Sequence, residues 1–292
     1  MQYLVLNILC WVVFTQTIRY AQRRQARDYV VGAVNYVLAA AVCLIALAAL
    51  ASLRGAPPLL PAATLGAACG ASYFGQFLLL LVAYRLAGVG ITMALVSMGV
   101  LVPVLLSWCL WAEPMTAWRW AAVALLPAAM VLVRPIRDQG ARLNWKADAV
   151  LLAVFLNNGL MGAFHKAVTI YAAANSAPEP FLFFQPYQLV YEAFLFLVAA
   201  LCSVGYVMYR RGGCGGAEMA LGSVVGVSNV LGTLLTVVAL SLVAAAVFFP
   251  TVTCALVVLS VILSRILWGE RVTPRQAVGL GVAVCIVVLV NL

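Results

Sequence analysis

Ten long apolar stretches dominate the sequence. They cover residues 2–18, 29–52, 61–85, 88–111, 118–134, 149–171, 181–208, 217–241, 243–267 and 275–291. A helix needs about 20 apolar residues to cross the hydrocarbon core of a bilayer. Because 66% of the 292 residues are hydrophobic and only 9% are charged, a water-soluble domain could not bury the apolar surface. The sequence therefore predicts an all-α polytopic membrane protein with ten transmembrane helices.

The sequence also contains an internal repeat. The repeated motifs are Leu65-Gly66-x-x-x-Gly70-x-Ser72 with Leu221-Gly222-x-x-x-Gly226-x-Ser228, and Trp111-x-Glu113-x-x-Thr116 with Trp268-x-Glu270-x-x-Thr273. The two shifts, 156 and 157 residues, differ by one insertion. Each copy holds five stretches, and an odd number turns the second copy upside down in the membrane. We expect two inverted five-helix repeats, residues 1–138 and 148–292, joined by a linker at 139–147.

An inverted repeat of this kind is typical of secondary transporters. The first stretch has a cleaved signal peptide as its alternative interpretation. It lacks the basic segment and the small-residue cleavage site of such a peptide, and the repeat needs it as the counterpart of the sixth stretch. We expect the paired glycines to let helices pack closely.

The net charge of +9 could indicate a protein that binds nucleic acid, but the distribution of the basic residues along the chain favours another explanation. Sorting the 17 Lys and Arg residues by alternate sides of the ten helices leaves only Arg54, Arg119 and Lys166 on one side. This asymmetry is the positive-inside pattern. It predicts basic loops in the cytoplasm, both termini outside and no nucleic-acid partner. Seven of the eight cysteines fall inside apolar stretches without metal-ligand spacing, so we expect no metal and no other cofactor.

Two five-helix copies, each with a Trp-x-Glu-x-x-Thr turn before its last helix, resemble the drug/metabolite transporter (DMT) superfamily and its EamA-like bacterial group. The resemblance covers essentially the whole chain. It implies a carrier of small metabolites or drugs in the bacterial cytoplasmic (inner) membrane, acting as a monomer or homodimer. The chain departs from the family in its charge-predicted orientation. Its first stretch also lacks the acidic residue by which the small multidrug-resistance relatives bind cations and protons.

Ionisable groups inside apolar stretches are expensive in lipid, which makes them the first candidates for function. Glu192 shares a helical face with Gln185 and Gln188. We expect Glu192 to carry the proton that couples substrate movement to a gradient. The alternative is a structural role, in which a protonated or paired Glu192 only stabilises contacts between helices. His165 is the second proton-coupling candidate or a satisfied structural group. Lys166 pairs with Glu192, binds a substrate carboxylate or extends to the outer interface.

Uncharged polar side chains in the stretches are the remaining candidates for substrate binding, with hydrogen bonds between helices as their alternative. They are Asn35, Tyr36, Tyr73, Gln76, Asn158, Tyr187, Tyr191 and Asn229. Pro103 and Pro250 interrupt their stretches and are hinge candidates. Thr116 and Thr273 are expected to cap the helices that follow them, and Glu113 and Glu270 to complement the dipoles of the same helices.

These patterns predict a secondary transporter of a small, amphipathic molecule that works by alternating access, and the family resemblance implies that it exports this molecule. The sequence has no nucleotide-binding loop, so proton coupling or exchange is the expected energy source. A flippase-type carrier of a lipid-linked substrate is the alternative within transport. An intramembrane enzyme would need a metal cluster, a carboxylate pair or a nucleophile–base set, and none is visible in the sequence.

Overall fold

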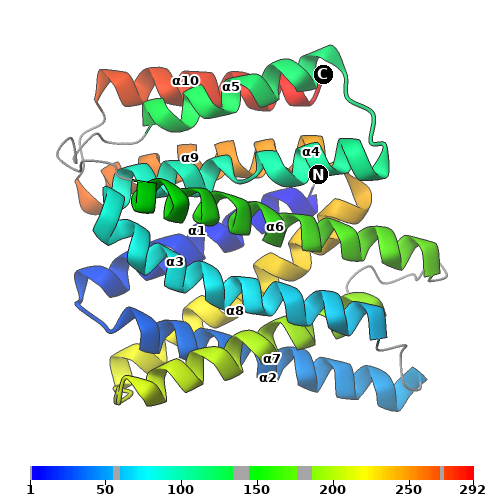
Figure 1. Ribbon diagram of the computed structural model, residues 1–292, viewed down its shortest axis with the longest axis vertical. Helices are drawn as coiled ribbons and strands as arrows, with labels where there is room; N and C mark the ends of the chain where they lie inside the picture. The colour runs from blue at the N-terminus through cyan, green and yellow to red at the C-terminus, as the bar shows by residue number, and fades with distance from the viewer. Residues whose placement is uncertain (1, 55–59, 134–144, 176–185, 270–272) are drawn as a thin grey trace. The chain divides into compact units, whose positions relative to one another are not determined.

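The computed structural model describes residues 2–54, 60–133, 145–175, 186–269 and 273–292. In these ranges the regular structure is helical throughout (Figure 1). The helices are α1 (Gln2–Arg23), α2 (Asp28–Arg54), α3 (Leu60–Met98), α4 (Leu101–Trp111), α5 (Ala117–Val133), α6 (Trp145–Asn175), α7 (Pro186–Tyr209), α8 (Gly216–Leu242), α9 (Ala245–Trp268) and α10 (Pro274–Val290). The all-α prediction is confirmed.

Seven helical segments within the described residues are long and apolar enough to cross a membrane. They belong to α1, α2, the first part of α3, α6, α7, α8 and α9. Three further apolar helices are shorter, at 10–17 residues, and cover Leu95–Trp111, Ala117–Leu132 and Pro274–Val290. These helices indicate a multi-pass membrane protein.

The break between α3 and α4 differs in position from the sequence prediction. The break expected at residues 86–87 is absent, because α3 continues to Met98, and the chain breaks instead at Gly99 and Val100. Pro103 has no N–H to donate to the Gly99 carbonyl, which instead accepts from Val102 at 3.1 Å. Pro103 therefore lies in the first turn of α4, where a missing N–H costs little, and not in a helix interior.

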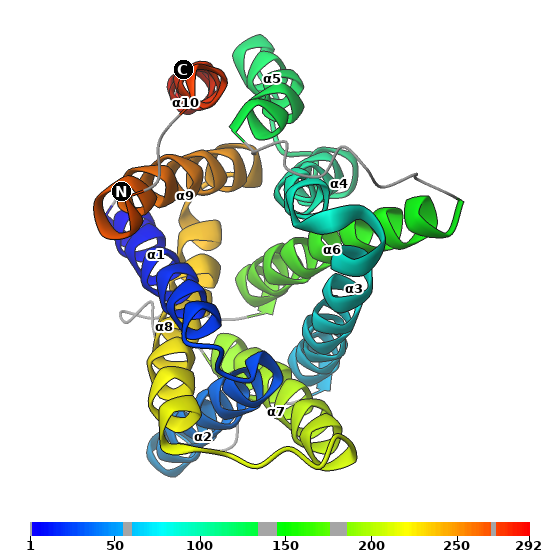
Figure 2. The ribbon, with the colours of Figure 1, turned by 90° about the vertical axis from the view of Figure 1, so that its left-hand side faces the viewer.

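The chain forms two compact units, and each takes helices from both predicted repeats. Unit 1 contains Met1–Phe74 and Phe164–Leu242, and unit 2 contains Gly75–Ala163 and Val243–Leu292. Within unit 1, α2 packs along α7 and α8, and α1 packs along α8 (Figure 2). Within unit 2, α5 packs along α10, and α9 contacts both helices.

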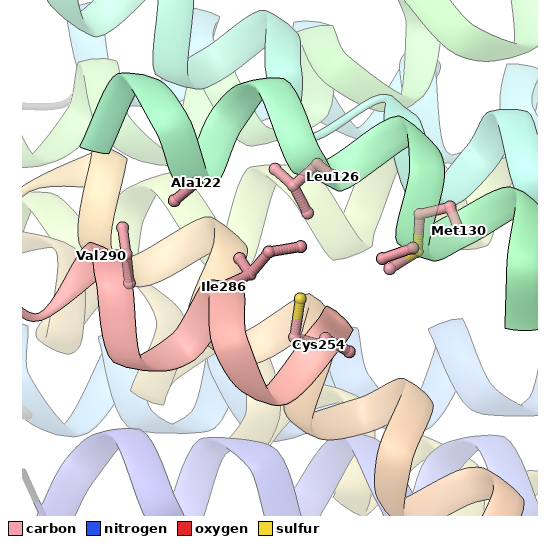
Figure 3. Packing of buried hydrophobic residues seen from close by; sticks show 8 residues of the cluster. Ala122, Leu126, Met130, Cys254, Ile286 and Val290 are labelled. Atoms are coloured by element: carbon pink, nitrogen blue, oxygen red, sulfur yellow. The ribbon is translucent and has the colours of Figure 1, made fainter. Parts of the chain in front are cut away.

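One apolar core cluster of unit 2 lies where α5, α9 and α10 meet. Leu126 and Met130 of α5, Ile286 of α10 and Cys254 of α9 are fully buried and point toward one another (Figure 3). Their interdigitation holds the three helices together through close packing. Cys254 acts here as a small apolar side chain, as the sequence led us to expect.

The glycine pair of α3 brings this helix against α7 in unit 1. A Cβ atom on Gly66 would overlap the backbone carbonyl oxygen of Tyr191, and one on Gly70 would overlap that of Leu195. Only a residue without a side chain allows the two backbones to approach so closely. The predicted role of these glycines in helix contact is confirmed.

The repeat-related pair on α8 makes the same kind of contact with α2. A Cβ on Gly222 would lie 3.0 Å from the carbonyl oxygen of Val31, and one on Gly226 would lie 2.9 Å from that of Asn35. In both pairs, glycines one turn apart meet carbonyls one turn apart. Each glycine pair therefore brings its helix close to the backbone of a neighbouring helix.

Two of the expected helix caps are present. Thr273 and Gln276 form a capping box at the start of α10, and the Thr116 side chain accepts from Arg119 N at 3.3 Å at the start of α5. Glu113 also binds a helix start, but that of α9: its Oε2 accepts from Ala245 N at 2.8 Å. The reason is that the α9 N-cap residue is an alanine, which supplies no acceptor of its own. Glu270 lies outside the described residues.

Replacing Glu113 by alanine is expected to destabilise the protein by about 1 kcal/mol, because the first N–H of α9 loses its acceptor. Glu113→Gln keeps an acceptor oxygen and should recover most of the loss. Thermal unfolding of the detergent-solubilised protein measures both variants. Equal losses for alanine and glutamine would contradict the capping role.

Candidate functional site

A buried polar cluster in unit 1 is centred on His165 of α6. Its Nε2 lies 3.1 Å from the Tyr73 hydroxyl, and its Nδ1 lies 2.9 Å from the Tyr191 hydroxyl. Both phenol rings stand edge-on to the imidazole, with centroids 6.1 and 5.7 Å away. The His165 side chain is only 6% exposed, and among the described residues each ring nitrogen has a tyrosine hydroxyl as its hydrogen-bond partner.

The close approach of α3 and α7 positions the two tyrosines. Gly66 touches the backbone of Tyr191, and Tyr73 follows Gly66 by two helical turns on the same face. Tyr36 of α2 packs edge-on against Tyr73, with ring centroids 6.4 Å apart. Cys69, fully buried one turn before Tyr73, lies beside Tyr191. The close packing of α3 against α7 at Gly66 therefore helps to position the tyrosines of the polar cluster.

Two buried polar side chains of α7 have no hydrogen-bond partner among the described residues. They are Gln188 and Glu192, one turn apart and both fully buried. Neither the amide atoms of Gln188 nor the carboxyl oxygens of Glu192 are satisfied. Glu192 directly follows Tyr191 in α7. A buried polar group without a partner destabilises the folded protein by about 1–3 kcal/mol. Such groups inside apolar helices are therefore candidates for binding a ligand or a proton. Gln185 lies outside the described residues.

Lys166 does not form the predicted hydrogen-bonded pair with Glu192. Its Nζ donates to the backbone oxygen of Leu240 at 3.2 Å, near the end of α8. A cation is favourable there because the carbonyl end of a helix carries partial negative charge. The side chain is 4% exposed, so it also does not extend to an interface.

The other candidates in unit 1 make contacts between helices. The Asn229 Nδ2 donates to the Asn35 Oδ1 at 3.1 Å, which joins α8 to α2. Tyr187 packs edge-on against Tyr171 of α6, with centroids 5.2 Å apart. For these residues the structure shows the interhelical role that was the alternative to substrate binding.

Four of the candidates belong to unit 2, namely Gln76, Pro103, Asn158 and Pro250. Gln76 accepts from Asn157 at 2.9 Å, and Asn158 donates to the Val96 carbonyl at 2.8 Å, next to the break between α3 and α4. Pro250 lies inside α9, as the sequence indicated.

Sequence reasoning missed Asn7 of α1. Its side chain is fully buried, and its Nδ2 donates to the Gly232 carbonyl and to Thr236 Oγ1, both at 2.8 Å. Asn7 is the one polar residue in the apolar run of residues 4–14, and this was the signal that could have found it.

Comparison with known proteins shows the fold alone. No family model matches the chain, and no curated protein matches it. The chain is similar to a solved structure described as "Crystal structure of protein", with a TM-score of 0.77 and 16% sequence identity. The match covers 99% of this chain and 94% of the other. The likeness is one of fold.

The His165 cluster has a definite chemical character. It combines hydroxyl, imidazole, amide and carboxyl groups among apolar helices of unit 1, and all of these side chains are buried except those of Tyr36 and Tyr73, which are partly exposed. Within the described ranges, no three His, Cys, Asp or Glu side chains are grouped to hold a metal ion. The cluster is suited to holding a proton on Glu192 and to hydrogen-bonding a polar molecule.

Proposed function

We propose that the protein is a secondary transporter of a small metabolite or drug-like amphipathic molecule, with the EamA-like architecture of the DMT superfamily. The observation that carries this proposal is the duplicated glycine contact. Gly66 and Gly70 of α3 meet α7 as Gly222 and Gly226 of α8 meet α2. Two sequence halves that make equivalent helix contacts support a repeat at the level of structure as well as sequence.

In this proposal all ten helices span the membrane. Five helices in each half then make the second half inverted, and alternating access follows from exchanging the conformations of the two halves. The protein lies in a bacterial cytoplasmic membrane with both termini outside, and it exports its substrate by proton coupling or exchange. Orientation rests on the loop charges, and export rests on the family resemblance.

The substrate site in this proposal is the His165 cluster. Gln188 and Glu192 support this choice because they are fully buried and have no partner among the described side chains. Buried polar groups that the protein leaves unpaired in lipid are suited to a ligand or a proton. The aromatic rings of Tyr36, Tyr73 and Tyr191 would supply the apolar contacts of an amphipathic molecule.

Substrate counterflow into proteoliposomes tests the proposal. Vesicles preloaded with amino acids, nucleosides, choline-like metabolites, sugars or drugs should take up the labelled form of the true substrate. Gln188→Leu should weaken substrate binding about 10-fold, since the ligand loses its amide partner. Leu201→Ala, at a 65% exposed position of the same helix, is the matched control and should transport normally. Absence of counterflow across the whole panel would contradict transport.

A further inference from the structure

The two hydrogen bonds of His165 run in opposite directions when the ring is neutral: one tyrosine donates to the ring and the other accepts from it. A neutral imidazole has one N–H and one bare nitrogen. A charged ring would carry two N–H groups, but His165 is 6% exposed, and its hydrogen-bond partners among the described residues are two phenols rather than a carboxylate. Burying an unpaired charge is more costly than burying a neutral ring. The ring therefore has one donor side and one acceptor side.

This asymmetry makes two identical phenols different. The tyrosine at the bare nitrogen must donate its O–H to the ring, so toward anything else it is an acceptor only. The tyrosine at the N–H accepts from the ring and keeps its own O–H as a donor. Either tautomer of His165 leaves one donor and one acceptor on Tyr73 and Tyr191, and exchange between tautomers swaps them.

The unpartnered groups of α7 have the same mixed character. The Gln188 amide offers a donor and an acceptor, as does a protonated Glu192 carboxyl, and Tyr191 lies between them in sequence. The other titratable groups around the cluster are the Cys43 and Cys69 thiols and the Tyr36 phenol, on α2 and α3. Lys166, the cation beside His165 in sequence, donates to Leu240.

We propose that His165 is a positioning residue that sets Tyr73 and Tyr191 as one donor and one acceptor for a ligand. The site then selects an uncharged group with a donor and an acceptor side by side, such as an amide or lactam, over an ion. This proposal rests on the proposed function, because it deepens the same site. It differs from proton relay, since no proton is transferred to the ligand.

Nitrogen NMR of the full-length protein tests the positioning role without any transport measurement. The chain has one histidine, so ¹⁵N-histidine labelling reports on His165 alone. A neutral ring is expected in the native protein. In Tyr73→Phe the proton should reside on Nδ1, and in Tyr191→Phe on Nε2, because an orphaned N–H is avoided more strongly than a bare acceptor. The same tautomer in both variants, or a charged ring in the native protein, would overturn the proposal.

Three probes built on one ring test the ligand class. They are nicotinamide, nicotinate and 1-methylnicotinamide, which are neutral, anionic and cationic. Nicotinamide at millimolar concentration should raise the thermal midpoint by about 2–4 °C and shift the His165 signal, while the charged probes should do neither. Leu201→Ala should respond like the native protein. Preference for a charged probe, or no response to any, refutes the ligand class, whereas failure of counterflow with these responses intact would refute transport alone.

Discussion

Alanine at Gly70 is expected to destabilise the protein by about 3 kcal/mol, the upper part of the range for overpacked sites. Its Cβ would overlap the carbonyl oxygen of Leu195, and a backbone oxygen cannot rotate away as a side chain can. Helices α3 and α7 would have to separate along their whole contact. Gly66→Ala, which meets the carbonyl of Tyr191, should have an effect of similar size.

Gly75→Ala is the matched control for both substitutions. Gly75 also lies in α3, but a Cβ there would meet nothing within 4 Å. Alanine is the better helix former by about 1 kcal/mol, so this variant should be as stable as the native protein or more so. Thermal unfolding of the three variants in detergent makes the comparison. If Gly70→Ala and Gly75→Ala unfolded at the same temperature, the glycine contact would not be the source of stability.

The helices of this protein were largely predictable from the apolar stretches. Residues 217–241 and 275–291 correspond closely to α8 (Gly216–Leu242) and α10 (Pro274–Val290), because Gly215-Gly216 and Thr273-Pro274 mark where the two helices begin. The division between α3 and α4 was not predictable in the same way. The whole region is apolar, so the break depends on a backbone effect of Pro103 on the Gly99 carbonyl.

Individual residues of the candidate site could be predicted from the sequence, but the hydrogen bonds and contacts between them could not. Glu192 and His165 stood out because ionisable groups are rare in lipid. Their neighbours depend on contacts between distant segments: the His165 partners lie 92 and 26 residues away in sequence. Lys166 shows the same limit, because its carbonyl partner in α8 has no side-chain signature.

Glu192→Gln is expected to abolish proton-driven substrate accumulation, reducing it to the level of protein-free vesicles. Glutamine has nearly the same shape as glutamic acid, but it cannot gain or lose a proton near neutral pH. Because both carboxyl oxygens of Glu192 lack a partner among the described residues, the substitution breaks no hydrogen bond in the structure. The protein should therefore fold normally, and exchange of substrate for substrate should remain measurable.

The measurement compares uptake driven by a pH gradient with counterflow at equal pH in the same vesicles. Glu218→Gln, in the first turn of α8, removes a carboxyl group outside the His165 cluster and should leave both activities unchanged. Glu192→Asp keeps a titratable acid and should retain part of the driven uptake. Driven uptake that survives in Glu192→Gln would remove Glu192 from the coupling mechanism. Loss of counterflow as well would instead make Glu192 a binding group for the substrate, because exchange needs binding but no proton.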